Sequence, residues 1–86
     1  TAFVGADGFS PELGLTTHLV EGAEIVRMMA SHAEQTVALA DSGKFGRTGF
    51  VHTLSMEDVD ILLTDSGLNE DAFSRIADIG VSVRCV

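Results

Sequence analysis

The feature that most constrains the fold of this sequence is a set of apolar blocks that are too short for helices. The blocks at 1–6 (TAFVGA), 36–40 (TVALA) and 59–64 (VDILLT) each run into a segment of small, acidic or hydroxyl residues. Continuous apolar runs of this length are typical of parallel strands that are covered on both faces. We therefore predict buried strands at these blocks and a last strand at 81–86.

Two segments between the blocks have the properties of helices. In 19–33, apolar residues recur every three or four positions, which predicts an amphipathic helix in which Met28 and Met29 fill the core. A second helix is expected at 70–79, because Asn69 can cap its start and Gly80 can end it in the left-handed conformation. A short strand is expected at 50–54 and a single helical turn at 55–58, whereas 7–14 reads as a loop without regular structure. The alternation of strands and helices predicts an α/β fold with a mainly parallel sheet and right-handed crossovers.

Length and charge exclude several classes of protein. The chain has 86 residues, which sets an upper limit of one domain, and a net charge of −8 that repels a nucleic-acid backbone. It has no apolar run long enough to span a membrane, and its single cysteine, Cys85, fits a reducing cytoplasm and is expected to be buried. Because the sequence starts without methionine and runs directly into an apolar stretch, we expect it to be a piece of a longer protein.

The polar loops after the predicted strands indicate a binding site at one edge of the sheet. Ligands of open parallel sheets bind outside the carboxyl ends of the strands, and the loops GADGFSPELGLTT, DSGKFGRTG and TDSGLNED leave such ends. The first two loops contribute a cation, hydroxyls and glycines, which are the groups that a phosphate requires. Their spacing matches neither the P-loop nor GxGxxG. The candidate residues from these two loops are Asp7, Thr16, Thr17, Ser42, Lys44 and Arg47.

Each candidate also has a purely structural interpretation. Lys44 can be a solvated loop residue, Asp7 and Asp41 can form turns, and Thr16 or Thr17 can cap the first helix. The three histidines share no metal-ligand spacing, so we expect no metal and no cofactor. A cluster of acids, Glu57, Asp58 and Asp60, is interpreted as a solvated face, with attraction of a cation as the alternative.

Three motifs give the sequence a family resemblance. FVGADGFSPELGLTT, VALADSGKFGRTGF and VDILLTDSGL resemble the C-terminal effector domain of DeoR-type transcriptional regulators, and the likeness runs from Phe3 to Val86. That family resembles in turn the ribose 5-phosphate isomerases and glucosamine 6-phosphate deaminases, which have a Rossmann-like sheet and bind phosphosugars. One departure is Gly43, where the family usually has a second serine.

The resemblance implies a cytoplasmic, non-catalytic and homo-oligomeric sensor of a phosphorylated sugar. DNA would be bound only by an N-terminal winged helix-turn-helix that lies outside this sequence, as does the first part of the sensor domain, so the ligand site here is expected to be incomplete. Lys44 corresponds to a lysine that contacts phosphate in the enzymes, whereas Val4 and Gly8 stand where isomerases have acids. The predicted ligand-binding set is Asp7, Gly8, Thr16, Thr17, Ser42, Lys44 and Arg47.

Two other classes of function stay open from the sequence. One is a fragment of a divergent sugar-phosphate isomerase or deaminase, in which Asp7 would act as the base. The other is an oligomerisation module with a degenerate pocket. The identity of the sugar and the direction of the response are also left open.

Overall fold

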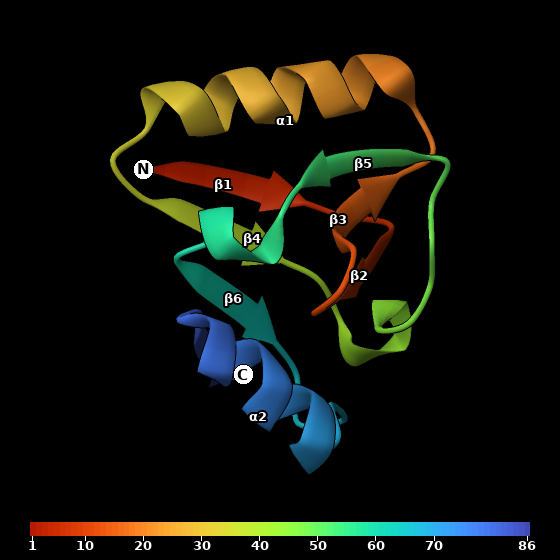
Figure 1. Ribbon diagram of the computed structural model, residues 1–86, viewed down its shortest axis with the longest axis vertical. Helices are drawn as coiled ribbons and strands as arrows, with labels where there is room; N and C mark the ends of the chain where they lie inside the picture. Colours follow the sequence, from red (N-terminus) through yellow and green to blue (C-terminus); the bar gives the residue numbers. More distant parts are fainter.

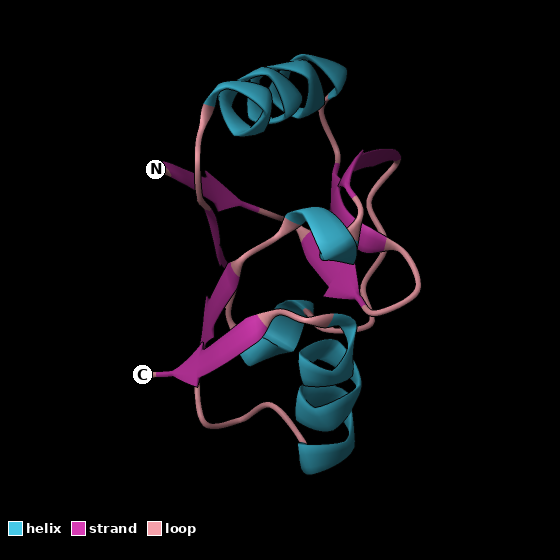
Figure 2. Ribbon diagram, turned by 60° about the vertical axis from the view of Figure 1, so that its left-hand side comes forward, coloured by secondary structure: helices cyan, strands magenta, loops and turns pink.

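A four-stranded parallel sheet organises the molecule. The computed structural model describes residues 1–86, in which β1 (Ala2–Gly5), β4 (Thr36–Leu39), β6 (Ile61–Thr64) and β7 (Ser82–Cys85) pair in the order β1-β4-β6-β7. Figure 1 shows α1 (Val20–His32) and α2 (Glu70–Ile79) at opposite ends of the molecule. Both helices lie on the same face of this sheet (Figure 2). The predicted α/β fold with a mainly parallel sheet is confirmed.

The second helix begins and ends where its sequence predicts. The Asn69 side chain accepts a hydrogen bond from the Ala72 amide at 2.7 Å, and Gly80 ends α2 with a φ of 114°. The first helix differs, because its N-cap is Leu19 and no side chain caps it. The prediction that Thr16 or Thr17 caps α1 is wrong, since both threonines lie in a strand.

A small antiparallel sheet occupies a region that includes the predicted loop at 7–14. β2 (Gly8–Ser10), β3 (Gly14–Thr17) and β5 (Val51–Leu54) pair in the order β2-β3-β5. The hairpin between β2 and β3 is closed by the Leu13 amide, which donates to Ser10 Oγ at 3.0 Å. Gly14 has a φ of +72°, and a Cβ there would lie 2.1 Å from the Leu54 carbonyl oxygen, so only glycine fits. The prediction of an irregular loop at 7–14 is therefore wrong, while the strand at 50–54 is confirmed.

The core lies between the inner face of the parallel sheet, the small sheet and α2. Its largest fully buried side chains are Phe9, Leu15, Met56, Leu62 and Ile76. The ring of Phe9 packs edge-on against that of Phe45, with centroids 5.6 Å apart. Met56 belongs to a 3-10 turn at Met56–Asp58, as predicted for this segment.

Three side chains predicted to be buried are exposed. Met28 and Met29 are 66% and 42% exposed, because α1 directs its small residues, such as Ala23, toward the core. Cys85 is exposed, because β7 is the edge strand of the sheet. The core therefore contains the hairpin residues Phe9 and Leu15 and not the two methionines of α1.

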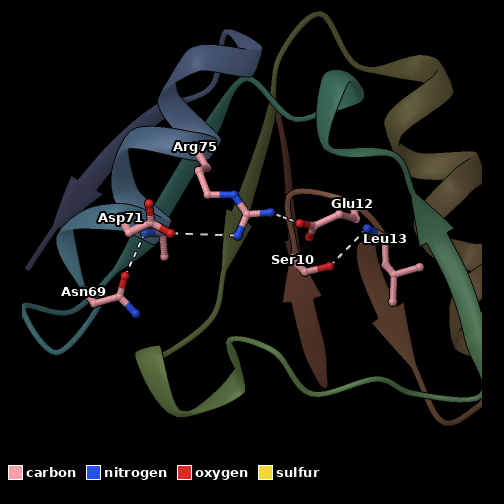
Figure 3. A network of polar contacts seen from close by, with 7 residues as sticks. Ser10, Glu12, Leu13, Asn69, Asp71 and Arg75 are labelled. Carbon is pink, nitrogen blue, oxygen red and sulfur yellow. Dashed lines mark hydrogen bonds and ion pairs between the residues drawn. The ribbon is translucent and has the colours of Figure 1, made fainter.

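A surface ion-pair network joins α2 to the small sheet. Figure 3 shows the Arg75 guanidinium between Glu12 of the β2–β3 turn and Asp71 of its own helix, the latter at 3.9 Å. Exposed pairs of this kind contribute little stability individually, and this one links α2 to the turn of the hairpin. Neither helix has the length and the apolar composition that crossing a membrane would require.

Candidate functional site

An open cavity lies at the carboxyl ends of β1, β4 and β6. Its volume is about 670 Å³, and it is the larger of the two principal cavities of the molecule. The position agrees with the general location of ligand sites in open parallel sheets. The polar residues that line it are Asp7, Thr17, Asp41, Lys44, Thr64 and Asp65.

Asp7, two residues beyond the end of β1, has a carboxyl whose pKa is lowered. Its Oδ2 atom accepts hydrogen bonds from the His18 amide at 3.0 Å and from the Thr17 hydroxyl at 2.9 Å. These two bonds lower the pKa of the Asp7 carboxyl, with smaller contributions from the charges of His18 and Lys44. The Asp7 Oδ1 atom has no hydrogen-bond partner in the protein, so one carboxylate oxygen is left for a ligand.

Lys44 supplies the positive charge of the cavity. It ends a 3-10 turn, Ser42–Lys44, and the Lys44 amide donates to the Asp41 carbonyl oxygen at 3.0 Å. The ammonium forms no salt bridge, although its charge reaches Asp7 and contributes to the lowered pKa of that carboxyl. All donors of the Lys44 side chain are therefore available to an anion.

Asp65, at the end of β6, connects two of the loops around the cavity. Its Oδ2 accepts from the Ser42 amide at 3.0 Å and its Oδ1 accepts from the Gly67 amide at 2.8 Å. The Ser42 hydroxyl, the Ser42 amide and the Gly67 amide lower the pKa of the Asp65 carboxyl. A Cβ on Gly67 would lie 2.5 Å from Ser42 Oγ, so a larger residue there would have to displace the Ser42 side chain. Asp65 thus holds the turn that carries Lys44.

Asp65 is a residue that the candidate list from the sequence omitted. An aspartate that is followed two positions later by glycine is typical of a turn in which the side chain accepts its own downstream amide, as Asp65 does from Gly67. That signal predicts the local turn. It does not predict the bond to Ser42, which is 23 residues away in the sequence.

The structure brings some of the predicted site residues together and places others outside the cavity. Asp7, Thr17 and Lys44 line it, whereas Gly8, Thr16, Ser42 and Arg47 do not. The buried hydroxyl of Thr16 donates to the Gly8 carbonyl oxygen at 3.3 Å and accepts from the Gly49 amide at 2.9 Å. Gly8 is equally structural, because a Cβ there would lie 2.1 Å from the Arg47 carbonyl oxygen.

The cavity combines carboxylate oxygens with a single ammonium group. Three carboxylates and one ammonium face the cavity, and carboxylate oxygens accept hydrogen bonds from hydroxyl groups while Lys binds a phosphate as a point charge. The buried Thr64 hydroxyl has no hydrogen-bond partner. No group of three or more His, Cys, Asp and Glu side chains is arranged to hold a metal ion.

Comparisons with known proteins agree with this reading of the fold. The family model described as the DeoR C-terminal sensor domain matches residues 1–66. The chain is 36% identical over 81 residues to the HTH-type transcriptional regulator GlpR of Haloferax volcanii, covering 94% of this chain and 32% of the relative. It is 32% identical over 82 residues to the HTH-type transcriptional regulator GolR of Listeria innocua, covering 95% of this chain and 32% of the relative. It is 30% identical over 81 residues to a putative aga operon transcriptional repressor of Escherichia coli O157:H7, covering 94% of this chain and 30% of the relative.

These relatives are transcriptional regulators, and the chain spans about a third of their length. The family model covers most of the chain, including every residue that lines the cavity except Val86. The chain therefore belongs to the DeoR C-terminal sensor domain family.

Proposed function

We propose that this chain is part of the sensor domain of a DeoR-type repressor of sugar catabolism, and that it binds a phosphorylated sugar. The observation that carries the proposal is the unpaired Lys44 ammonium, which lies near the ionised Asp7 in the cavity at the carboxyl edge of the sheet. In this arrangement Lys44 meets the phosphate, and the free oxygen of Asp7 accepts a sugar hydroxyl.

The hydrogen bonds of Asp7 favour binding over catalysis. A general base is most effective when its pKa lies near the working pH, whereas the bonds to His18 and Thr17 lower the pKa of Asp7. The alternative function, a divergent sugar-phosphate isomerase or deaminase, requires Asp7 to abstract a proton. We infer that the domain binds its effector without converting it, which also fits the transcriptional regulators among its relatives.

In the full-length protein we place DNA binding in a winged helix-turn-helix N-terminal to residues 1–86. The net charge of −8 makes this region itself a poor surface for DNA. Effector binding would then shift a homo-oligomeric cytoplasmic regulator between states of different operator affinity. The sensor acts through the stability of those states and needs no contact of its own with the operator.

A thermal-shift panel on the full-length regulator tests the proposal. We expect one or more phosphorylated sugars to raise the Tm and the matching unphosphorylated sugars to leave it unchanged, because the phosphate supplies the charge that Lys44 binds. The same phosphosugar should change operator affinity in fluorescence anisotropy. If no phosphosugar moves the Tm, the domain is an oligomerisation module and the proposal fails. Turnover of ribose 5-phosphate or glucosamine 6-phosphate would favour the enzyme.

A further inference from the structure

The first helix has one face toward the core and one face toward solvent. Ala23 is fully buried, and Val26 and Ala30 pack against the core cluster, so these residues define its inner face. In both ribbon views α1 forms one end of the molecule, and no other element lies beyond it (Figures 1 and 2). The opposite side, here called the outer face of α1, is exposed. Its residues are Glu21, Ile25, Met28, Met29 and His32.

The centre of this outer face is apolar, where a surface helix normally carries charged residues. Ile25, Met28 and Met29 are 59%, 66% and 42% exposed. The exposed side of α2 is different, because it carries the charged residues Asp71 and Arg75. Methionine is enriched in the surfaces through which proteins associate. The outer face of α1 therefore indicates a contact with a second apolar surface.

The residues of the outer face have the spacing of a helix that pairs with another helix. Glu21, Ile25, Met28 and His32 follow one another at intervals of four, three and four, so they form one line along α1. The apolar residues occupy the middle of the line, with an acid in the first turn and a basic residue in the last. Neither Glu21 nor His32 forms a salt bridge within the protein. Both ends of the line are therefore available to a partner of opposite charge.

We propose that two copies of this chain associate through α1, with the two helices antiparallel about a two-fold axis. In such a contact each residue meets its counterpart in both directions, so the surface has to complement itself. An axis at the midpoint of Val26 and Arg27 places Ile25 opposite Met28 of the second copy. The same axis places Glu21 opposite His32 of the second copy. One surface thus satisfies both its apolar and its charged positions, which identifies a second copy as the occupant.

Charge determines the direction of the pairing. A parallel pair would place two Glu21 carboxylates together and two His32 rings together, whereas the antiparallel pair joins unlike groups at both ends. The helix dipoles are also opposed in the antiparallel pair. Nδ1 of His32 lies 2.9 Å from the Met28 carbonyl oxygen of its own helix. This leaves Nε2 to donate to Glu21 of the second copy when the ring is protonated.

The length of α1 limits the strength of the contact. Its 13 residues rise about 20 Å, so a contact confined to this helix belongs to the small interfaces, below about 1,200 Å². We therefore expect a reversible contact that depends on protein concentration. The proposal rests on the homo-oligomeric part of the proposed function and is independent of the effector.

Cross-linking of the full-length regulator tests the register of the two helices. In a Cys85→Ser background, Glu21→Cys and His32→Cys chains with different tags are co-expressed and treated with a short bismaleimide. We expect mixed dimers, because these two positions are opposite each other in the antiparallel pair. Two Glu21→Cys chains should cross-link rarely, since their thiols are about 16 Å apart along the helices. Absence of the mixed product, or an equal yield of like pairs, would overturn the proposal.

Sedimentation velocity of charge-insertion variants tests the contact without cross-linking. Ile25→Glu places a carboxylate at the centre of the outer face, and Ala77→Glu is the matched control on the exposed side of α2. We expect Ile25→Glu to raise the dissociation constant of the assembly roughly tenfold or more, because two carboxylates would be desolvated in the contact. Ala77→Glu should leave it within a few-fold of the unsubstituted regulator.

The outcomes separate this proposal from the function on which it rests. An oligomer that Ile25→Glu does not change overturns the α1 contact and leaves a homo-oligomeric regulator with another interface. An unsubstituted regulator that is monomeric at every concentration overturns both.

Discussion

Asp7 and Asp65 occupy equivalent positions and are used differently. Each follows a strand of the parallel sheet, each lines the cavity, and each has its pKa lowered by hydrogen bonds from backbone amides and a hydroxyl. Both carboxylate oxygens of Asp65 accept bonds from the protein, whereas Asp7 uses Oδ2 alone. The comparison shows that an acidic residue at the edge of a sheet is available to a ligand only if the loops leave one oxygen free.

The loops next to the two aspartates differ in what they pack against. Gly8, beside Asp7, lies against the backbone of Arg47, whereas Gly67, near Asp65, lies against the side chains of Ser42 and Asp65. Backbone atoms cannot rotate away from a new methyl group, but side-chain ends can. The Asp7 side of the cavity should therefore be the less tolerant of substitution.

The largest expected effect is that of Gly8→Ala. The new Cβ would lie 2.1 Å from the Arg47 carbonyl oxygen, so β2 and the loop after Lys44 must separate. We expect a loss of about 3 kcal/mol in the free energy of unfolding, measured by denaturant titration of the full-length regulator. Gly22→Ala in α1 is the control and should be neutral or stabilising, because no atom lies closer than 3.8 Å and alanine favours helix. Equal stabilities of the two variants would contradict this account.

On the Asp65 side, Gly67→Ala should have a smaller effect. Its Cβ would displace Ser42 Oγ, at 2.5 Å, and Asp65 Oδ1, at 2.9 Å. We expect a loss of about 1 kcal/mol, because both side chains can move at the expense of their hydrogen bonds. A loss as large as that of Gly8→Ala would remove the distinction between the two sides.

Substitution of each aspartate by the isosteric asparagine tests whether Asp7 serves ligand binding and Asp65 serves stability. Asp7→Asn should weaken phosphosugar binding about fivefold, because its free oxygen no longer accepts a sugar hydroxyl as a charged group. Asp65→Asn should lower the Tm of the unliganded regulator and change affinity less, since both of its oxygens contact the protein. Calorimetric titration and thermal melts of the two variants check this, and the reverse pattern would exchange the roles of the two residues.

The smallest effect is the dependence of stability on pH. Both carboxyls have pKa values below the ordinary 3.8, so their stabilising contribution is complete above that value and is lost as the pH falls through their lower pKa values in the folded protein. We expect the Tm to be insensitive to these groups above about pH 5 and to decline in more acidic solution. Asp7→Asn and Asp65→Asn should each make that decline shallower, and a decline that neither variant changes would assign it to other groups.

The parallel sheet could be predicted from sequence because its signals are local. The runs at 37–40 and 61–63 are apolar throughout, and α2 has its own capping residues in Asn69 and Gly80. The small sheet could not be predicted in the same way. Its strands are three or four residues long and rich in Gly, Ser and Thr, and β3 acquires its second neighbour from β5, more than thirty residues later in the chain.

The same distinction applies to the candidate site. The meeting of Asp7 with Lys44 follows from the rule that parallel strands end at one edge, so the sequence predicts it. The positions of Thr16 and Gly8 depend on the hairpin and on the loop at 47–49, which pack against them only in the folded state. The connection of Asp65 to Ser42 has the same non-local origin.

The central claim is that the charge of Lys44 binds the phosphate of the effector. Isothermal titration calorimetry of the full-length regulator tests it most directly, with Lys44→Met to remove the charge, Lys44→Arg to keep it, and Arg84→Ala as a cation outside the cavity. We predict that Lys44→Met weakens phosphosugar binding at least tenfold, or about 1.4 kcal/mol, while the other two variants stay within a few-fold of the unsubstituted regulator. Unchanged affinity of Lys44→Met would contradict the claim.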